Sequence, residues 1–154
     1  MNVEIRVQQA DFSVAAEYES LLARLPAGTG AVASFVGLVR EMAGTDDVQT
    51  LLLEHYPGMT ERSIGGIVDR AGERWPVSDV LVVHRVGELA PNAQIVLVQV
   101  ASAHRAAAFA ACEFIMDYLK TDAIFWKRET TSGGGRWVES TAEDRDRASA
   151  WKTG

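Results

Sequence analysis

Hydrophobic and polar residues follow helix or strand spacing through most of the 154-residue chain. The clearest case is in residues 104–120, where Ala108, Cys112, Ile115 and Leu119 recur at three- or four-residue intervals. This spacing predicts a helix with one buried face. Residues 124–129 come next and are rich in aromatic side chains, which predicts a strand.

The other segments give alternating strand and helix signals. Val3, Ile5 and Val7 alternate with polar residues, and Ser13 is placed to cap the helix after them. The further predicted elements are strands at 30–40, 48–56, 79–85, 94–102 and 136–138, a helix at 60–74, and a charged, helical tail at 143–151. Helices interspersed with paired strands predict an α+β fold with helices packed on the sheet. We find no repeat or linker, so residues 1–154 are expected to form one domain, with 143–154 as its charged tail.

The strand at 30–40 contains a glycine and ends in an arginine. Gly37 would weaken strand packing, so it predicts a bulge or a close approach of another backbone. Arg40 precedes the polar stretch 44–47, which we expect to be a mobile loop. Taken alone, Arg40 is also explained as a solvated loop residue.

Composition narrows the function classes. The chain is 47% hydrophobic and 23% charged, and its net charge of −6 argues against broad nucleic-acid binding. Its one cysteine permits no internal disulfide, which favours a reducing compartment. No apolar run is long enough to span a bilayer, so we expect a cytoplasmic protein without a membrane partner. The three histidines are scattered in sequence without a ligand spacing, so we predict no metal site.

Charged residues flank the predicted helix at 104–120 in an unusual arrangement. His104 and Arg105 open it, where the helix dipole disfavours cations and free N–H groups favour a bound anion. Lys120 closes it, and Lys127 lies on the strand that returns. These four basic groups are expected to border one pocket. Each also has a simpler explanation. His104 can be a capping or surface histidine, Lys120 can complement the helix dipole, and the charge of Lys127 can keep an edge strand from pairing with another chain.

Several longer segments resemble a known family. They are FVGLVR at 35–40, LEHYPGMTE at 53–61, VVHRVGEL at 82–89, SAHRAAAF at 102–109, FIMDYLK at 114–120, FWKRE at 125–129 and RWVE at 136–139. In this order they resemble the MoaE family, the large catalytic subunit of molybdopterin synthase, over nearly the whole chain. The resemblance implies an α/β-hammerhead type fold with a mixed sheet. It also implies a homodimer that carries a small ubiquitin-like sulfur carrier at each end, a heterotetramer overall.

The resemblance also implies a reaction and a site. A sulfurtransferase of this kind converts cyclic pyranopterin monophosphate to molybdopterin with two sulfurs from the carrier's C-terminal thiocarboxylate, so no cofactor is expected. Lys120 is expected to act on the carrier's Gly-Gly tail and Lys127 on the substrate. The expected substrate-binding residues are Arg40, His104, Arg105, Phe35, Gly37, Leu38, Val39, Met116, Arg128 and Glu129.

One departure from the family concerns the C-terminal segment. Ser140 and Thr141 stand where a basic residue is expected to reach the neighbouring subunit's pocket, and Arg136 or Arg145 could replace it.

The alternative function is a non-catalytic module that binds an anionic metabolite or a partner's tail. Such a module would use Arg40, His104 and Arg105 without needing both lysines.

Overall fold

The computed structural model describes the backbone of residues 1–40, 42–43, 46–131, 134–138 and 140–153, and the side chains of residues 1–40, 50–128 and 140–152. Its first sheet runs in the spatial order β1 (Asn2–Gln8), β5 (Val77–Arg85), β7 (Gln94–Ser102) and β2 (Ala31–Leu38). Strand β1 is parallel to β5, and the other pairs are antiparallel. This mixed sheet confirms the predicted fold class.

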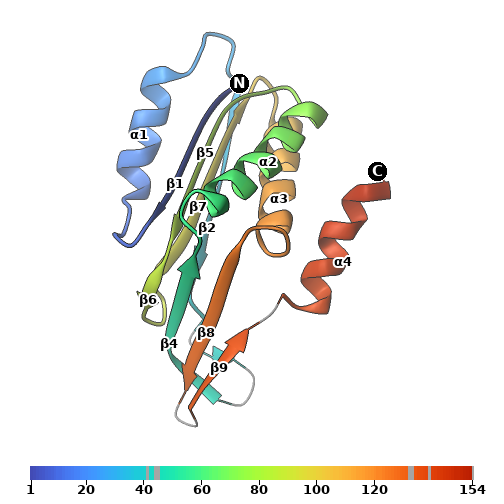
Figure 1. The fold of residues 1–154 in the computed structure, drawn as a ribbon. Coiled ribbons are helices and arrows are strands. Elements are labelled where there is room, and N and C mark those ends of the chain that lie inside the picture. The colour runs from blue at the N-terminus through green and yellow to red at the C-terminus, as the bar shows by residue number, and fades with distance from the viewer. Residues whose placement is uncertain (41, 44–45, 132–133, 139, 154) are drawn as a thin grey trace.

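Helices cover both faces of the first sheet (Figure 1). Helix α1 (Val14–Arg24) lies on one face, and α2 (Met59–Arg74) and α3 (Arg105–Leu119) lie on the other. Ser13 caps α1 as predicted, because its hydroxyl accepts a hydrogen bond from the Ala16 N–H.

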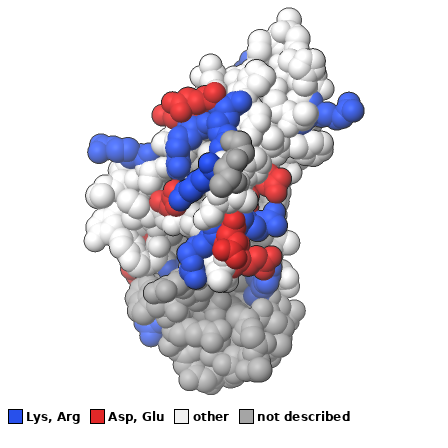
Figure 2. All heavy atoms as spheres, turned by 90° about the vertical axis from the view of Figure 1, so that its right-hand side faces the viewer, with Lys and Arg blue, Asp and Glu red and all other residues white. Residues whose placement is uncertain are grey.

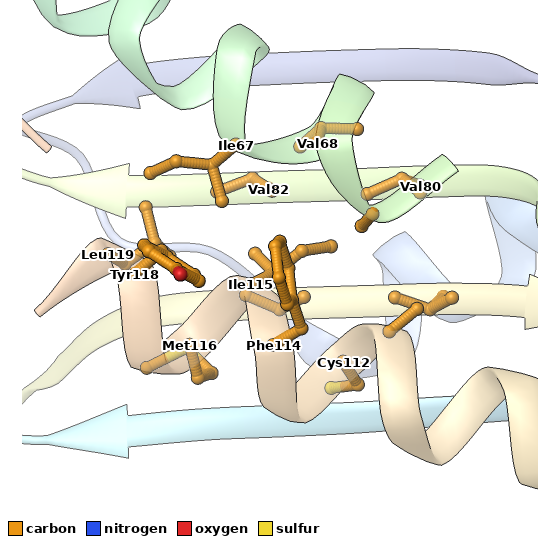
Figure 3. Close-up of a cluster of buried hydrophobic side chains, with 14 of the residues drawn as sticks. Ile67, Val68, Val80, Val82, Cys112, Phe114, Ile115, Met116, Tyr118 and Leu119 are labelled. Carbon is orange, nitrogen blue, oxygen red and sulfur yellow. The ribbon is translucent and has the colours of Figure 1, made fainter. Parts of the chain in front are cut away.

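The main core lies between the first sheet and the pair α2 and α3. Figure 3 shows Phe114 and Ile115 of α3 on the side of the helix that faces Val82 of β5 and Ile67 of α2. Phe114 and Ile115 are at most 2% exposed, and burying each contributes about 1.5–3 kcal/mol. This packing fixes the position of α3, and with it the residues at both of its ends.

A second sheet extends below the first in Figure 1. Its members are β4 (Asp46–His55), β8 (Phe125–Thr131), β9 (Gly134–Val138) and two short strands, β3 (Met42–Ala43) and β6 (Gly87–Leu89). Strand β4 pairs with β8 and with β6, and β8 pairs antiparallel with β9. Residues 87–89 lie between two predicted strands; they pair with β4, and Leu89 packs in an apolar cluster with Leu51 and Leu53. Gly44 and Thr45 of the expected 44–47 loop lie outside the described residues, and Asp46 and Asp47 begin β4.

The charged tail is helical, as predicted. Helix α4 (Ala142–Ala150) begins at a Thr141 cap and continues into a 3-10 turn, η1 (Trp151–Thr153). The Trp151 indole N–H donates to the Asp117 carboxylate at 2.7 Å, and the Trp151 ring packs edge-on against Phe114. The tail is thereby attached to α3 and the main core.

Gly37 lies at the irregularity that was expected, and its close neighbour is a side chain rather than the expected backbone. The register of β2 against β7 shifts between Gly37 and Leu38. A Cβ atom at Gly37 would lie 2.7 Å from Cγ1 of Val96, closer than real Cβ contacts come. The residue must therefore be glycine for β2 to pass β7 at this distance.

Candidate functional site

A cavity of about 1050 Å³ opens where the two sheets meet. Most of its lining comes from the end of β2 with the residues after it, the C-terminal end of α3, the start of β8, and the start of α4. Strands β4, β5 and β7 add Leu51, His84, and Ile95 with Val96. The cavity therefore gathers segments from residues 35 to 144, which are far apart in sequence.

The β2 wall contains a group of residues expected from sequence. Phe35, Gly37, Leu38, Val39 and Arg40 all line the cavity. The backbone of Val39 is held by two hydrogen bonds, from its N–H to the Ala93 carbonyl at 2.9 Å and to its carbonyl from the Asn92 N–H at 2.8 Å. These bonds fix the chain just before Arg40, whose guanidinium group is a strong anion binder.

Both expected catalytic lysines line the same cavity. The chain has three lysines in all, so two of the three converge here. Lys120 is the C-cap of α3, where its backbone N–H donates to the Met116 carbonyl at 3.2 Å. Lys127 lies on β8 opposite Leu53 of β4. The apolar side chains of Met116 and Phe125 line the cavity as well.

His84 is a cavity residue that the sequence reasoning missed. It is 6% exposed, its ring is stacked on that of Phe125 with centroids 4.1 Å apart, and its Nδ1 lies 2.9 Å from the Arg85 carbonyl oxygen. Burial lowers the pKa of His84 to about 4, with smaller contributions in the same direction from the positive charges of Lys127 and Lys120. The available signal was one histidine at the end of the buried run 80–83, which is otherwise Val and Leu.

The start of α4 brings acidic and hydroxyl groups to the cavity, another feature that was not predicted. Ser140, Thr141, Glu143 and Asp144 line it. The Asp144 N–H donates to the Thr141 hydroxyl at 3.0 Å, which stabilises the first turn of α4. Arg147 joins α4 to α3 through Glu113 at 3.0 Å. Figure 2, which faces the side of the molecule that carries α4, shows basic and acidic side chains interspersed there rather than separated.

His104 and Arg105 do not reach this cavity within one chain. Both are exposed at the N-terminal end of α3, and a helix of 15 residues is about 22 Å long. The expectation that all four basic groups border one pocket of a single chain is therefore wrong. The substrate-binding role of His104 and Arg105 stays a prediction.

Four other predicted residues are not among those that line the described cavity. Arg128 is exposed and does not line it. The side chains of Glu129 and Arg136 lie outside the described residues. Arg145 donates to the Ser140 carbonyl and does not line the cavity of its own chain.

Within the described parts of the chain, no three His, Cys, Asp or Glu side chains are grouped so that they could hold a metal ion. None of the helices in those parts combines the length and the apolar character needed to cross a membrane.

Comparisons with known proteins agree with this architecture. Residues 7–122 match the family model described as MoaE protein. The molybdopterin synthase catalytic subunit of Vibrio cholerae serotype O1 is 55% identical over 152 residues, covering 99% of this chain and all of the relative. Among solved structures, a molybdopterin biosynthesis MoaE protein from Burkholderia ambifaria has a TM-score of 0.83 at 50% identity and covers 99% of each chain. A molybdopterin synthase from Staphylococcus aureus has a TM-score of 0.79 at 29% identity, over 86% of this chain and 95% of that one.

Proposed function

The chain belongs to the MoaE protein family, and on that premise we propose that it is the catalytic subunit of a molybdopterin synthase. In this role it converts cyclic pyranopterin monophosphate to molybdopterin. Each thiocarboxylated C-terminus of the small carrier protein gives up one sulfur and is left as a carboxylate, so two carrier molecules supply the two sulfurs of the dithiolene. The enzyme is a sulfurtransferase of molybdenum cofactor biosynthesis.

The observation that carries this proposal is the convergence of Lys120 and Lys127 on the cavity that Arg40 also lines. A module that only binds an anionic metabolite could do so with Arg40 and needs neither lysine. The sulfur donor is an anion, and more anionic charge develops as sulfur leaves its carbonyl carbon. Positioned ammonium groups in a partly enclosed site stabilise such charge, which supports catalysis over simple binding.

The two lysines differ in their surroundings, and this supports different roles. Lys120 is exposed at the end of α3, where an entering carrier tail can reach its ammonium group. Lys127 is half-buried on the cavity wall beside Phe125. In the proposed mechanism Lys120 holds the thiocarboxylate tail and Lys127 faces the pterin substrate, where it offsets charge or exchanges a proton. Arg40 binds the substrate phosphate through its planar set of N–H donors.

Assembly is part of the proposal. The chain forms a homodimer with one carrier at each end, and a heterotetramer results. A complex of subunits 1 and 2 of a molybdopterin-converting factor from Helicobacter pylori is known, and that protein shares the fold at 18% identity. In the homodimer, the exposed His104 and Arg105 of one copy complete the anion site of the other, because they cannot reach their own. Sulfur arrives with the carrier, so the enzyme needs no resident cofactor or metal, and it works in the cytoplasm.

Reconstitution tests the proposed function. The purified chain is mixed with thiocarboxylated carrier and cyclic pyranopterin monophosphate, and the dithiolene product is measured. Product is expected with thiocarboxylated carrier and none with carrier ending in an ordinary carboxylate. Light scattering of the mixture should give the mass of the heterotetramer. A monomer that neither binds the carrier nor forms product would contradict the proposal.

A further inference from the structure

His84 occupies a place in the cavity that the proposed mechanism does not use. Its ring lies on Phe125, the neighbour of Lys127 on the same side of β8, and the two rings are only 25° from parallel. Strand β5 supplies the histidine and β8 supplies both Phe125 and Lys127. The stack therefore fixes the imidazole against the strand that carries one of the two lysines.

The hydrogen bond of Nδ1 determines the tautomer of this ring. A backbone carbonyl only accepts hydrogen bonds, so the Nδ1 atom that lies 2.9 Å from the Arg85 oxygen must carry the proton. The lone pair is then on Nε2. With one ring face on Phe125 and Nδ1 bound to the backbone, Nε2 is the polar atom of His84 that remains for the cavity.

Burial keeps the His84 ring neutral, and the positive charges around it act in the same direction. Lys127 and Lys120 both line the same cavity and oppose a further positive charge on the imidazole. His55 of β4 acts on the ring in the same direction. The other charged groups on the cavity wall are Arg40 after β2 and the two carboxylates Glu143 and Asp144 of α4. A neutral imidazole nitrogen can accept a hydrogen bond from an ammonium group without repulsion between like charges.

We propose that His84 is a positioning residue for the sulfur-transfer reaction, and that its Nε2 accepts a hydrogen bond from the Lys127 ammonium in the complex with carrier and substrate. The inference rests on the proposed function. The bond directs the ammonium toward the reacting groups and stabilises its charged form. His84 itself exchanges no proton, since it is a poor base when buried beside two lysines.

Three variants separate this role from packing. His84→Gln keeps an amide acceptor near the place of Nε2, His84→Asn keeps only a donor near the place of Nδ1, and His84→Phe keeps only the stacked ring. In the complete complex, single-turnover rates are expected to fall on the order of 10- to 100-fold in the Asn and Phe variants, the size expected for a misplaced catalytic group. The Gln variant should stay within about threefold of wild type, and KM should change little in all three.

The pH dependence of the single-turnover rate is a second, independent test of the role of His84. Loss of an acceptor that favours the ammonium lowers the pKa of the lysine amine. The lysine limb of the rate profile should therefore move to lower pH in the Asn and Phe variants and stay in place in the Gln variant. A purely structural role would lower the amount of folded enzyme without moving this limb.

Nitrogen NMR of the imidazole tests the premise on the chain alone, without any activity. The His84 ring is expected to carry its proton on Nδ1 and to remain neutral between pH 5 and 8. A proton on Nε2, a titration near the ordinary histidine pKa, wild-type rates in the Asn and Phe variants, or a Gln variant as slow as Phe would each overturn the inference. A wild-type complex that forms no product would instead overturn the proposed function. When the wild-type complex is active, the rates of the His84 variants test the role of His84 alone.

Discussion

His104 and Lys120 cap the opposite ends of α3, which places two groups of expected substrate-binding and catalytic residues about 22 Å apart in one chain. The main core holds α3 rigidly against the first sheet, because Phe114 and Ile115 are buried between α2 and β5. No rearrangement of side chains can close this distance. In the proposed homodimer, a second copy of the chain brings the two ends together.

Mixed dimers test this arrangement. Lys120→Ala and Arg105→Ala chains, each nearly inactive alone, are unfolded together and refolded in equal amounts. If each pocket takes Lys120 from one copy and Arg105 from the other, half of the dimers are mixed and each has one intact pocket. The rate should then recover to about a quarter of wild type, as two-fold symmetry requires. No recovery would show that the residues act within one chain or not at all.

Arg40 should contribute to substrate binding through its charge. A hydrogen bond to a charged group is worth about 1.5–3 kcal/mol, so Arg40→Ala should weaken substrate binding about 10- to 150-fold at low salt. Arg62→Ala is the matched control, because Arg62 is exposed on α2 and does not line the cavity. Calorimetric titration with the substrate measures both, and equal affinities would contradict the assignment of Arg40.

The two glycines Gly37 and Gly66 should respond in opposite ways to alanine. A Cβ at Gly37 meets Val96 at 2.7 Å, while one at Gly66 in α2 meets nothing within 4 Å. Gly37→Ala should reduce the free energy of unfolding by about 1–3 kcal/mol through overpacking. Gly66→Ala should raise it by up to about 1 kcal/mol, the helix propensity difference. Urea denaturation measures both, and a neutral Gly37→Ala would mean that β2 can move away from β7.

Burial of neutral His84 should make stability depend on pH. The folded-state pKa of His84 is about 4, below the value of about 6.5 in an unfolded chain. Between these values the unfolded state binds a proton that the folded state does not, so stability is complete above pH 6.5 and falls as the pH drops toward 4. The loss from this group should be on the order of 3 kcal/mol.

His84→Gln provides the comparison, since it removes the titrating group. Urea denaturation at several pH values between 4 and 7 should show a shallower slope for the variant than for wild type. The pKa of Asp11 is lowered by hydrogen bonds from Gln94 and the Phe12 backbone. Asp11 therefore changes the free energy of unfolding only below this pH range and does not affect the comparison of slopes. Identical slopes in the two proteins would contradict a buried neutral His84.

The strong periodic patterns predicted the fold well. The stripe containing Cys112 and Ile115 became α3, and the alternation at Val3, Ile5 and Val7 became β1. The short strands β3 and β6 were not predicted. Three residues such as Gly87–Leu89 carry no period of their own and become a strand only through pairing with β4.

The site could be predicted only where sequence neighbours are also spatial neighbours. Lys120 and Lys127 lie on consecutive elements, and both line the cavity. His84 and Glu143 enter the cavity through the pairing of distant strands and the packing of α4 on α3, which no local pattern encodes. The sequence did not show that His104 lies away from the cavity of its own chain, because the charge pattern at a helix start says nothing about the other end of the helix or about a second copy of the chain.

The central claim is that Lys120 and Lys127 carry out sulfur transfer in this cavity, and single-turnover assays of the reconstituted complex test it most directly. Lys120→Ala and Lys127→Ala should each lower the rate by on the order of 10²–10⁴, the range for a positioned acid–base group, while the carrier complex still forms. Lys152→Ala, a change to the exposed third lysine in η1, should leave the rate unchanged. Wild-type rates in both cavity variants would contradict the account.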